Sequence, residues 1–159
     1  MTASFERPCF SQPWSAELLS WSATGGRICL HRDGEPVATI ELARCAMGRI
    51  RLAYPVATHD VEVRVADVTS SEDLTAVLQA MVPVVREADP QCRKVVFVVD
   101  HSGSGHGTMS ALAEIAAAET AGFRYVVDVD IADAELSLLV EEPEWVTAVD
   151  LDLDHVPGT

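Results

Sequence analysis

Residues 94–140 decide the fold, and they read KVVFVVDHSGSGHGTMSALAEIAAAETAGFRYVVDVDIADAELSLLV. The first part, Val95–Val99, is a continuous apolar run typical of a strand covered on both faces. A glycine-rich loop follows, then a short alanine-rich helix expected over 109–121 and closed by Gly122, then two alternating strands over 125–140. This order predicts an α/β unit, and the loop stands where such units usually hold an anionic ligand.

Antiparallel strands are expected upstream of this unit. Four runs have strand character: 27–31, 37–42, 49–56 and 61–67. Asp33-Gly34 lies between the first two and is a strong hairpin signal. The third run would place Ile50, Leu52 and Tyr54 on one face, and the fourth alternates valines with polar residues. Residues 1–24 are interpreted as an N-terminal arm with a short helix at 15–20.

A long helix is expected between the fourth strand and Val95. Thr69 and Glu72 fit a capping box at its start. Apolar residues then recur at helical spacing until Asp89-Pro90, which ends the pattern. Pro83 is expected to kink the helix or to end its regular part, because it removes one hydrogen bond.

The sequence therefore predicts a single α/β domain with a mixed sheet over residues 1–159. Its parts are the arm 1–24, a core 25–153 and a tail 154–159, and the alternating run 145–153 could add an edge strand.

The charge and composition of the chain limit the kinds of molecule that it is expected to bind. The formal net charge is −14, with 25 acidic against 11 basic residues. Such a chain would repel nucleic acid and anionic membrane surfaces, and no apolar run approaches a membrane span. A small cationic amine would be attracted, although an acidic surface can also simply aid solubility. The four cysteines lack metal-site spacing, so reduced thiols in a cytoplasmic protein are expected and no metal site is predicted.

Three segments resemble a known superfamily. AETAGFRYVVDVDIADAELSLLV (Ala118–Val140) is similar to the C-terminal part of the GCN5-related N-acetyltransferase (GNAT) fold. Gly34–Asp67 and Asp89–Asp100 resemble the siderophore-biosynthesis branch, whose enzymes acylate the side-chain amine of lysine or hydroxylysine in aerobactin-type and mycobactin-type pathways. The resemblance implies a mixed, mostly antiparallel sheet with crossover helices, an acyl-CoA such as acetyl-CoA as co-substrate and a small-molecule amine as acceptor. It leaves open a homodimer or a protein partner.

Several positions depart from the pattern of that branch. Arg64 stands where a histidine is usual, and Glu62 where a glycine is usual. Residues 68–73 lack the glycines of the pyrophosphate-binding motif, and Ala118 replaces a tyrosine. Asp100 is retained. These departures predict weak binding of acyl-CoA and leave two hypotheses: an acyl-CoA-dependent N-acyltransferase, or a catalytically inactive GNAT-fold binding or partner protein.

The candidate site residues follow from the resemblance and from residue chemistry. The catalytic candidates are Asp100, His101 and His106, for which capping and solvated loop positions are the alternatives. The cofactor-binding candidates are Val65, Ala66, Asp67, Val68, Thr69, Ser70 and Ser71. The substrate-binding candidates are His59 and Arg64. The G-x-G-x-G run at 103–107 matches neither a Walker A nor a dinucleotide motif, so a flexible loop is the preferred interpretation.

Overall fold

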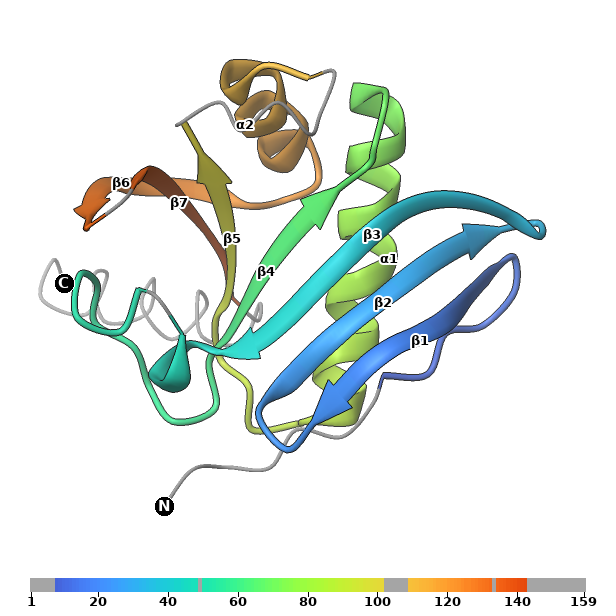
Figure 1. Cartoon of the computed structure of the whole chain (residues 1–159), viewed down its shortest axis with the longest axis horizontal. Coiled ribbons are helices and arrows are strands. Elements are labelled where there is room, and N and C mark those ends of the chain that lie inside the picture. The colour runs from blue at the N-terminus through green and yellow to red at the C-terminus, as the bar shows by residue number, and fades with distance from the viewer. Residues whose placement is uncertain (1–7, 49, 102–108, 133, 143–159) are drawn as a thin grey trace, which may run out of the picture.

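In the computed structural model the described residues, 8–48, 50–101, 109–132 and 134–142, form one seven-stranded sheet and two α-helices (Figure 1). The strand order is β1-β2-β3-β4-β5-β7-β6. In chain order the elements are β1 (Trp14–Ser22), β2 (Gly25–Arg32), β3 (Glu35–Arg44), the 3-10 turn η1 (Cys45–Met47), β4 (Val61–Ala66), α1 (Ser71–Ala88), β5 (Val95–Asp100), α2 (Ala111–Thr120), β6 (Arg124–Ile131) and β7 (Ala134–Glu141). Only β4 and β5 run parallel, so the sheet is mixed and mostly antiparallel, as predicted.

The N-terminal third of the chain is an antiparallel meander. Asp33 and Gly34 both adopt positive φ, 54° and 83°, and turn β2 into β3, which confirms the expected hairpin. The helix expected at 15–20 is wrong, because these residues belong to β1 and pair with β2. Trp14 and Trp21 at the ends of β1 pack against the core, and this tertiary contact overrides the weak local signal.

The strand expected over 49–56 is also wrong. β4 pairs directly with β3, beginning at Arg44 and Val61, so no place is left for a strand between them. The intervening residues instead form η1 and turns that lie across one face of the sheet. Ile50 is fully buried there, whereas Leu52 is 90% exposed, so the apolar alternation did not reflect one buried face.

Helix α1 differs from its prediction at the cap and at the proline. Ser70, rather than Thr69, is the N-cap, and its hydroxyl accepts from the amide of Asp73. The helix continues through Pro83 to Ala88. Pro83 and Gln79, whose carbonyl loses its donor, are both exposed, so water can satisfy that carbonyl. Asp89 ends the helix as expected.

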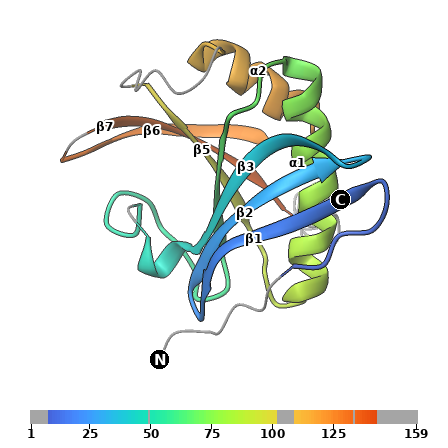
Figure 2. The same cartoon turned by 45° about the vertical axis from the view of Figure 1, so that its right-hand side comes forward.

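The sheet has two differently covered faces. Both helices lie on one side of it (Figure 2), where α1 and α2 contribute to the larger apolar cluster. A smaller cluster, containing Ile50, Val96 and Leu138, lies on the other face. The four cysteines are unbridged, as expected of reduced thiols. No helix in the described part of the chain is long and apolar enough to cross a membrane.

A buried ion cluster ties the lower end of the sheet together. The guanidinium of Arg44, which is fully buried, lies 2.7 Å from Asp89 Oδ2 and donates to the carbonyl of His59 at 2.9 Å. The same carboxylate oxygen is 2.8 Å from His59 Nδ1. The cluster therefore joins the end of β3, the start of β4 and the end of α1.

Removing the carboxylate of this cluster should destabilise the fold strongly. Asp89→Ala would leave the Arg44 guanidinium buried without its counter-ion, which costs about 3–5 kcal/mol. The matched control is Arg124→Ala, because Arg124 is 73% exposed in its pair with Glu142 and should cost at most about 1 kcal/mol. Urea denaturation of both variants measures the difference, and equal losses would contradict this role for the cluster.

Candidate functional site

The candidate site begins where the two parallel strands separate. β4 and β5 pair from Val61 and Val95 only as far as Val63 and Phe97, although both strands continue. In Figure 1 their arrows leave a common origin and diverge, with α2 near the end of β5. The sheet is therefore open at the carboxyl ends of its only parallel pair.

Beyond Val63 and Phe97, the described parts of β4 and β5 are not paired with each other. The amide of Val61 donates to the carbonyl of Lys94, so odd-numbered residues of β4 direct their backbone groups toward β5. Because this direction alternates along a strand, the N–H and C=O of Val65 point into the opening. The same alternation directs the backbone of Val98 on β5 toward β4. An extended amide-containing ligand could pair with these groups.

The N-terminus of α1 follows directly after β4. Asp67 adopts a positive φ of 63° and accepts from the Thr39 hydroxyl at 2.9 Å, which turns the chain from strand to helix. The amides of Ser71 and Glu72 lie in the first turn, where N–H groups lack an acceptor within the helix. A phosphate group would be attracted to these donors. The acidic first turn opposes this, but Arg32 pairs with Asp73 at 2.8 Å and offsets one of its charges.

A groove of about 410 Å³ extends from this helix end between α1 and α2. Its walls are small or polar side chains: Ser71, Glu72, Thr75, Ala76, Gln79, Ala113, Ala116, Ala117 and Thr120. The helices can approach closely because alanines face the groove from α2, and the Thr75 hydroxyl donates to the Ala117 carbonyl at 3.1 Å. The alanine-rich composition of α2 thus forms one wall of a groove that begins beside the strand opening.

Two carboxylates influence each other near the end of β5. Burial and, to a smaller extent, the negative charge of Asp100 together raise the pKa of Glu114, on α2, to about 7. A carboxyl group with this pKa exchanges its proton near neutral pH. A cation bound between the two groups would relieve their repulsion. Glu114 is therefore a candidate proton acceptor near the carboxyl end of β5.

His101 and its neighbours occupy the next position along the chain. His101 Nε2 lies 2.5 Å from the hydroxyl of Ser137, which is 1% exposed. That hydroxyl donates to Asp128 Oδ1, also at 2.5 Å. The amide of His101 donates to the carbonyl of Glu135 at 2.9 Å, so β7 holds both ends of this residue.

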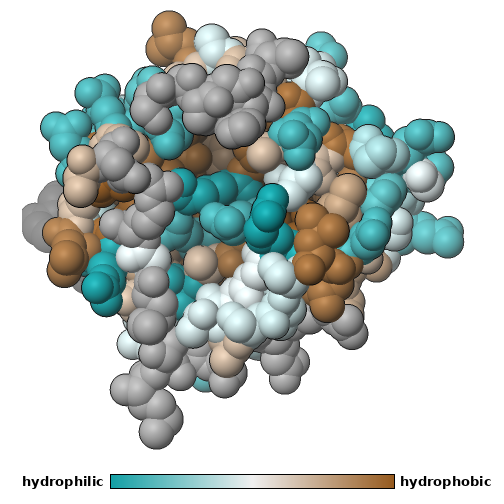
Figure 3. Space-filling model, in the orientation of Figure 1, coloured by the Kyte–Doolittle hydropathy of each residue, from teal (hydrophilic) through white to brown (hydrophobic). Residues whose placement is uncertain are grey.

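Charged side chains also cover the sheet face opposite the helices. Figure 3 shows hydrophilic residues gathered in the middle of this face. The strand register places Arg27 opposite Glu41, and Glu41 opposite Arg64. The Arg64 Nε donates to Glu62 Oε2 at 3.2 Å, and both side chains are largely buried. These groups lie on β2, β3 and β4, beside the opening.

The architecture matches solved acetyltransferases. The aminoglycoside acetyltransferase AAC(6')-Ib in complex with coenzyme A and kanamycin superposes with a TM-score of 0.60 at 16% identity, over 76% of this chain and 68% of that one. The complex of AAC(6')-Ib with paromomycin and acetyl-CoA gives the same TM-score and identity, over 76% and 66%. The chain has a GNAT fold. An uncharacterized protein from Bacillus halodurans is similar too, with a TM-score of 0.58 at 17% identity over 76% and 60%.

The structural similarity covers only part of each neighbouring protein. The chain spans about two thirds of the length of the AAC(6')-Ib structures. By sequence, it matches no protein-family model and none of the curated proteins. The comparisons therefore show the GNAT fold alone.

The structure brings some of the sequence candidates together and separates others. Residues 65–71 run along the end of β4 to the start of α1, beside the opening, and Asp100 and His101 lie at the end of β5. Arg64 lies on β4, one residue before this run. His59 does not join them, because it sits before β4 in the ion cluster at the opposite end of the strand. His106 lies outside the described residues.

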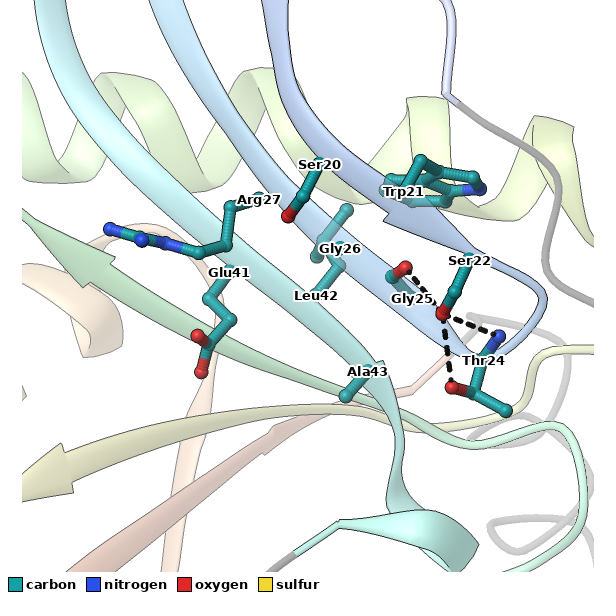
Figure 4. Close-up of a pocket in the computed structure, with 10 residues that line it drawn as sticks. All are labelled: Ser20, Trp21, Ser22, Thr24, Gly25, Gly26, Arg27, Glu41, Leu42 and Ala43. Carbon is teal, nitrogen blue, oxygen red and sulfur yellow. Dashed lines mark hydrogen bonds between the residues drawn. The ribbon is translucent and has the colours of Figure 1, made fainter.

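A second depression of the GNAT sheet lies on β1, β2 and β3, and its lining includes Glu41, the cross-strand partner of Arg64. It measures about 360 Å³ and is centred on the start of β2 (Figure 4). Gly25 and Gly26 allow neighbouring strands to approach closely here, because a Cβ on Gly25 would lie 2.0 Å from the Leu42 carbonyl oxygen. Its charged lining consists of Arg27 and Glu41, which face each other across β2 and β3. With one cross-strand charge pair and no further titratable group in its lining, it is not assigned as the site.

Sequence reasoning missed three residues near the end of β5. Glu114 was concealed among the alanines of α2, and only the packing of that helix brings it near Asp100. Ser137 and Asp128 read as polar positions of alternating strands, yet their register makes them direct partners. An acidic residue on the buried side of the helix pattern was the one available signal.

The raised pKa of Glu114 should make stability depend on pH. The folded state keeps the Glu114 proton up to about pH 7, whereas the unfolded chain releases it near 4.5, so stability falls as pH rises across this window. Glu114→Gln lacks this penalty. Its melting temperature relative to the natural protein should rise between pH 4.5 and 7 and then level off, as measured by thermal unfolding. Glu119→Gln, at an exposed position of the same helix, is the control and should show no such trend.

Proposed function

We propose that this protein transfers an acyl group from acyl-CoA to a small-molecule amine at the opening between β4 and β5. The observation that carries the proposal is the meeting of three features at one place: unpaired strand edges, the start of α1 and the carboxylates of Asp100 and Glu114. The crystallised AAC(6')-Ib neighbours, with coenzyme A and aminoglycosides, support the reaction class.

Acyl-CoA would occupy the opening and the groove. The amide groups of its pantetheine arm pair with the backbone of Val65, in the way that a strand would. Its pyrophosphate lies near the amides of Ser71 and Glu72, and its nucleotide extends into the groove between α1 and α2. The missing glycine motif and the Glu72 carboxylate predict modest affinity, since backbone pairing supplies most of the binding.

The acceptor amine would approach from the acidic side of the opening. Asp100 orients the ammonium group, and Glu114 accepts one of its protons, because its pKa near 7 suits a general base at neutral pH. The free amine then attacks the thioester carbonyl and the C–N bond forms. The nitrogen gives up its second proton as the C–S bond breaks, and this proton leaves with coenzyme A as its thiol. Arg64, on the face of the sheet opposite the helices and paired with Glu62, could bind a carboxylate of the acceptor.

A lysine-type side chain is the acceptor that we favour. The acidic pair suits a primary ammonium, and Arg64 suits the carboxylate of the same amino acid. This agrees with the resemblance of residues 34–67 and 89–100 to siderophore-biosynthesis enzymes. Such a reaction, together with four unbridged cysteines, fits a cytoplasmic enzyme. The alternative is an inactive GNAT-fold partner protein, favoured by the absent glycine motif.

Binding and turnover distinguish these two functions. Calorimetry with acetyl-CoA and longer acyl-CoAs should detect binding, and Ala113→Phe should weaken it at least tenfold by filling the groove. Leu112→Phe is the matched control, because Leu112 is 77% exposed on the same helix. No binding of any acyl-CoA would support the partner protein and contradict the enzyme.

A turnover assay should distinguish the roles of the Glu114 and Asp100 carboxylates. With lysine as acceptor, release of the coenzyme A thiol should fall about a hundredfold in Glu114→Gln, within the range for loss of a general base. Its activity should lose the inflection near pH 7. Asp100→Asn should mainly raise KM for the amine. Unchanged rates in both variants would exclude this site.

A further inference from the structure

Three side chains form a continuous chain behind the end of β5. They are His101, which follows β5, Ser137 on β7 and Asp128 on β6, and the two contacts are each 2.5 Å. The sheet register creates the chain, because Ser137 pairs with Val99 on one side and with Asp128 on the other. Ser137 is 1% exposed, whereas Asp128 is exposed. The chain thus runs from the site to the surface.

The number of protons available determines which group donates in each hydrogen bond from His101 through Ser137 to Asp128. Hydrogen bonds from Ser137 and then Tyr125 lower the pKa of Asp128, so its carboxylate is ionised and can only accept. The single hydroxyl proton of Ser137 is therefore given to Asp128. The hydroxyl oxygen can then only accept from His101, so the proton of the neutral imidazole must sit on Nε2.

We propose that Ser137 and Asp128 are positioning residues that fix the tautomer of His101, so that its Nδ1 serves as a hydrogen-bond acceptor for the substrate amine. The proposal rests on the proposed function and deepens it. An ammonium group at the carboxyl end of β5 would then meet a neutral nitrogen acceptor on Nδ1. After Glu114 has removed one proton, this hydrogen bond would help to orient the amine toward the thioester carbonyl.

This arrangement resembles the logic of a catalytic triad, in which a buried carboxylate sets the tautomer of a histidine. Here a serine stands between the carboxylate and the imidazole, and the serine itself is too buried to react. The opposite tautomer would present an N–H at Nδ1 and would repel an ammonium. Control of the tautomer therefore decides whether His101 attracts or rejects the acceptor.

The tautomer can be measured by ¹⁵N NMR of histidine-labelled protein at alkaline pH. His101 should carry its proton on Nε2. His59 is an internal reference, because its Nδ1 donates to the carboxylate of Asp89 and should show the opposite tautomer. Ser137→Ala should turn His101 into a tautomer mixture, and Ser137→Thr should restore the single form. A proton on Nδ1 in the natural protein, or no change in Ser137→Ala, would overturn the proposal.

A second variant can reverse the direction of these hydrogen bonds without changing a buried side chain. Residue 128 is exposed, and in Asp128→Asn the new amide group can donate to the Ser137 hydroxyl. A fraction of the His101 side chains should therefore adopt the tautomer with its proton on Nδ1. In turnover assays both Ser137→Ala and Asp128→Asn should raise KM for the amine at least fivefold, with acyl-CoA affinity unchanged. A shifted tautomer with unchanged KM would refute the role in amine binding. The tautomer readout needs no substrate, so failure of acyl transfer itself is recognised separately.

Discussion

The separation of β4 from β5 is the constraint on which the structure depends. Parallel pairing stops at Val63 and Phe97, although each strand remains paired on its outer side, β4 with β3 and β5 with β7. Each strand is thus held on its outer side, while the described parts of β4 and β5 do not pair with each other beyond Val63 and Phe97. Helices α1 and α2 pack behind this opening, and the Arg44–Asp89 pair lies at the end where the strands still meet. A strand edge of this kind can pair with an extended ligand.

The charges around this opening favour some ligands over others. The acidic pair at the end of β5 favours a cation, and the first turn of α1 offers amides beside acidic side chains. The net charge of −14 adds a general attraction for amines and a general repulsion of anions. In the proposed function, an acyl-CoA would rely on backbone pairing more than on phosphate binding, which would reconcile a GNAT fold with the absence of its glycine motif.

Much of the fold could be predicted from the sequence, because periodicity and turn chemistry are local. The Asp33-Gly34 hairpin, helix α1 and the β6–β7 pair were predicted from such signals. β1 and residues 50–60 were not, since their conformations depend on pairing and burial against distant segments. The site divides in the same way. Asp100 was visible in a motif, whereas Glu114 needed helix packing and the Ser137–Asp128 contact needed strand register.

Site-resolved amide hydrogen exchange, with and without acetyl-CoA, tests the central claim most directly. If the opening between β4 and β5 holds the pantetheine arm, the amide of Val65 should exchange more slowly in the presence of ligand, together with those of Ser71 and Glu72. Amides around Gly25 and Gly26, in the second depression, should not change. Protection at that depression, or unchanged exchange of Val65 at saturating ligand, would contradict the account.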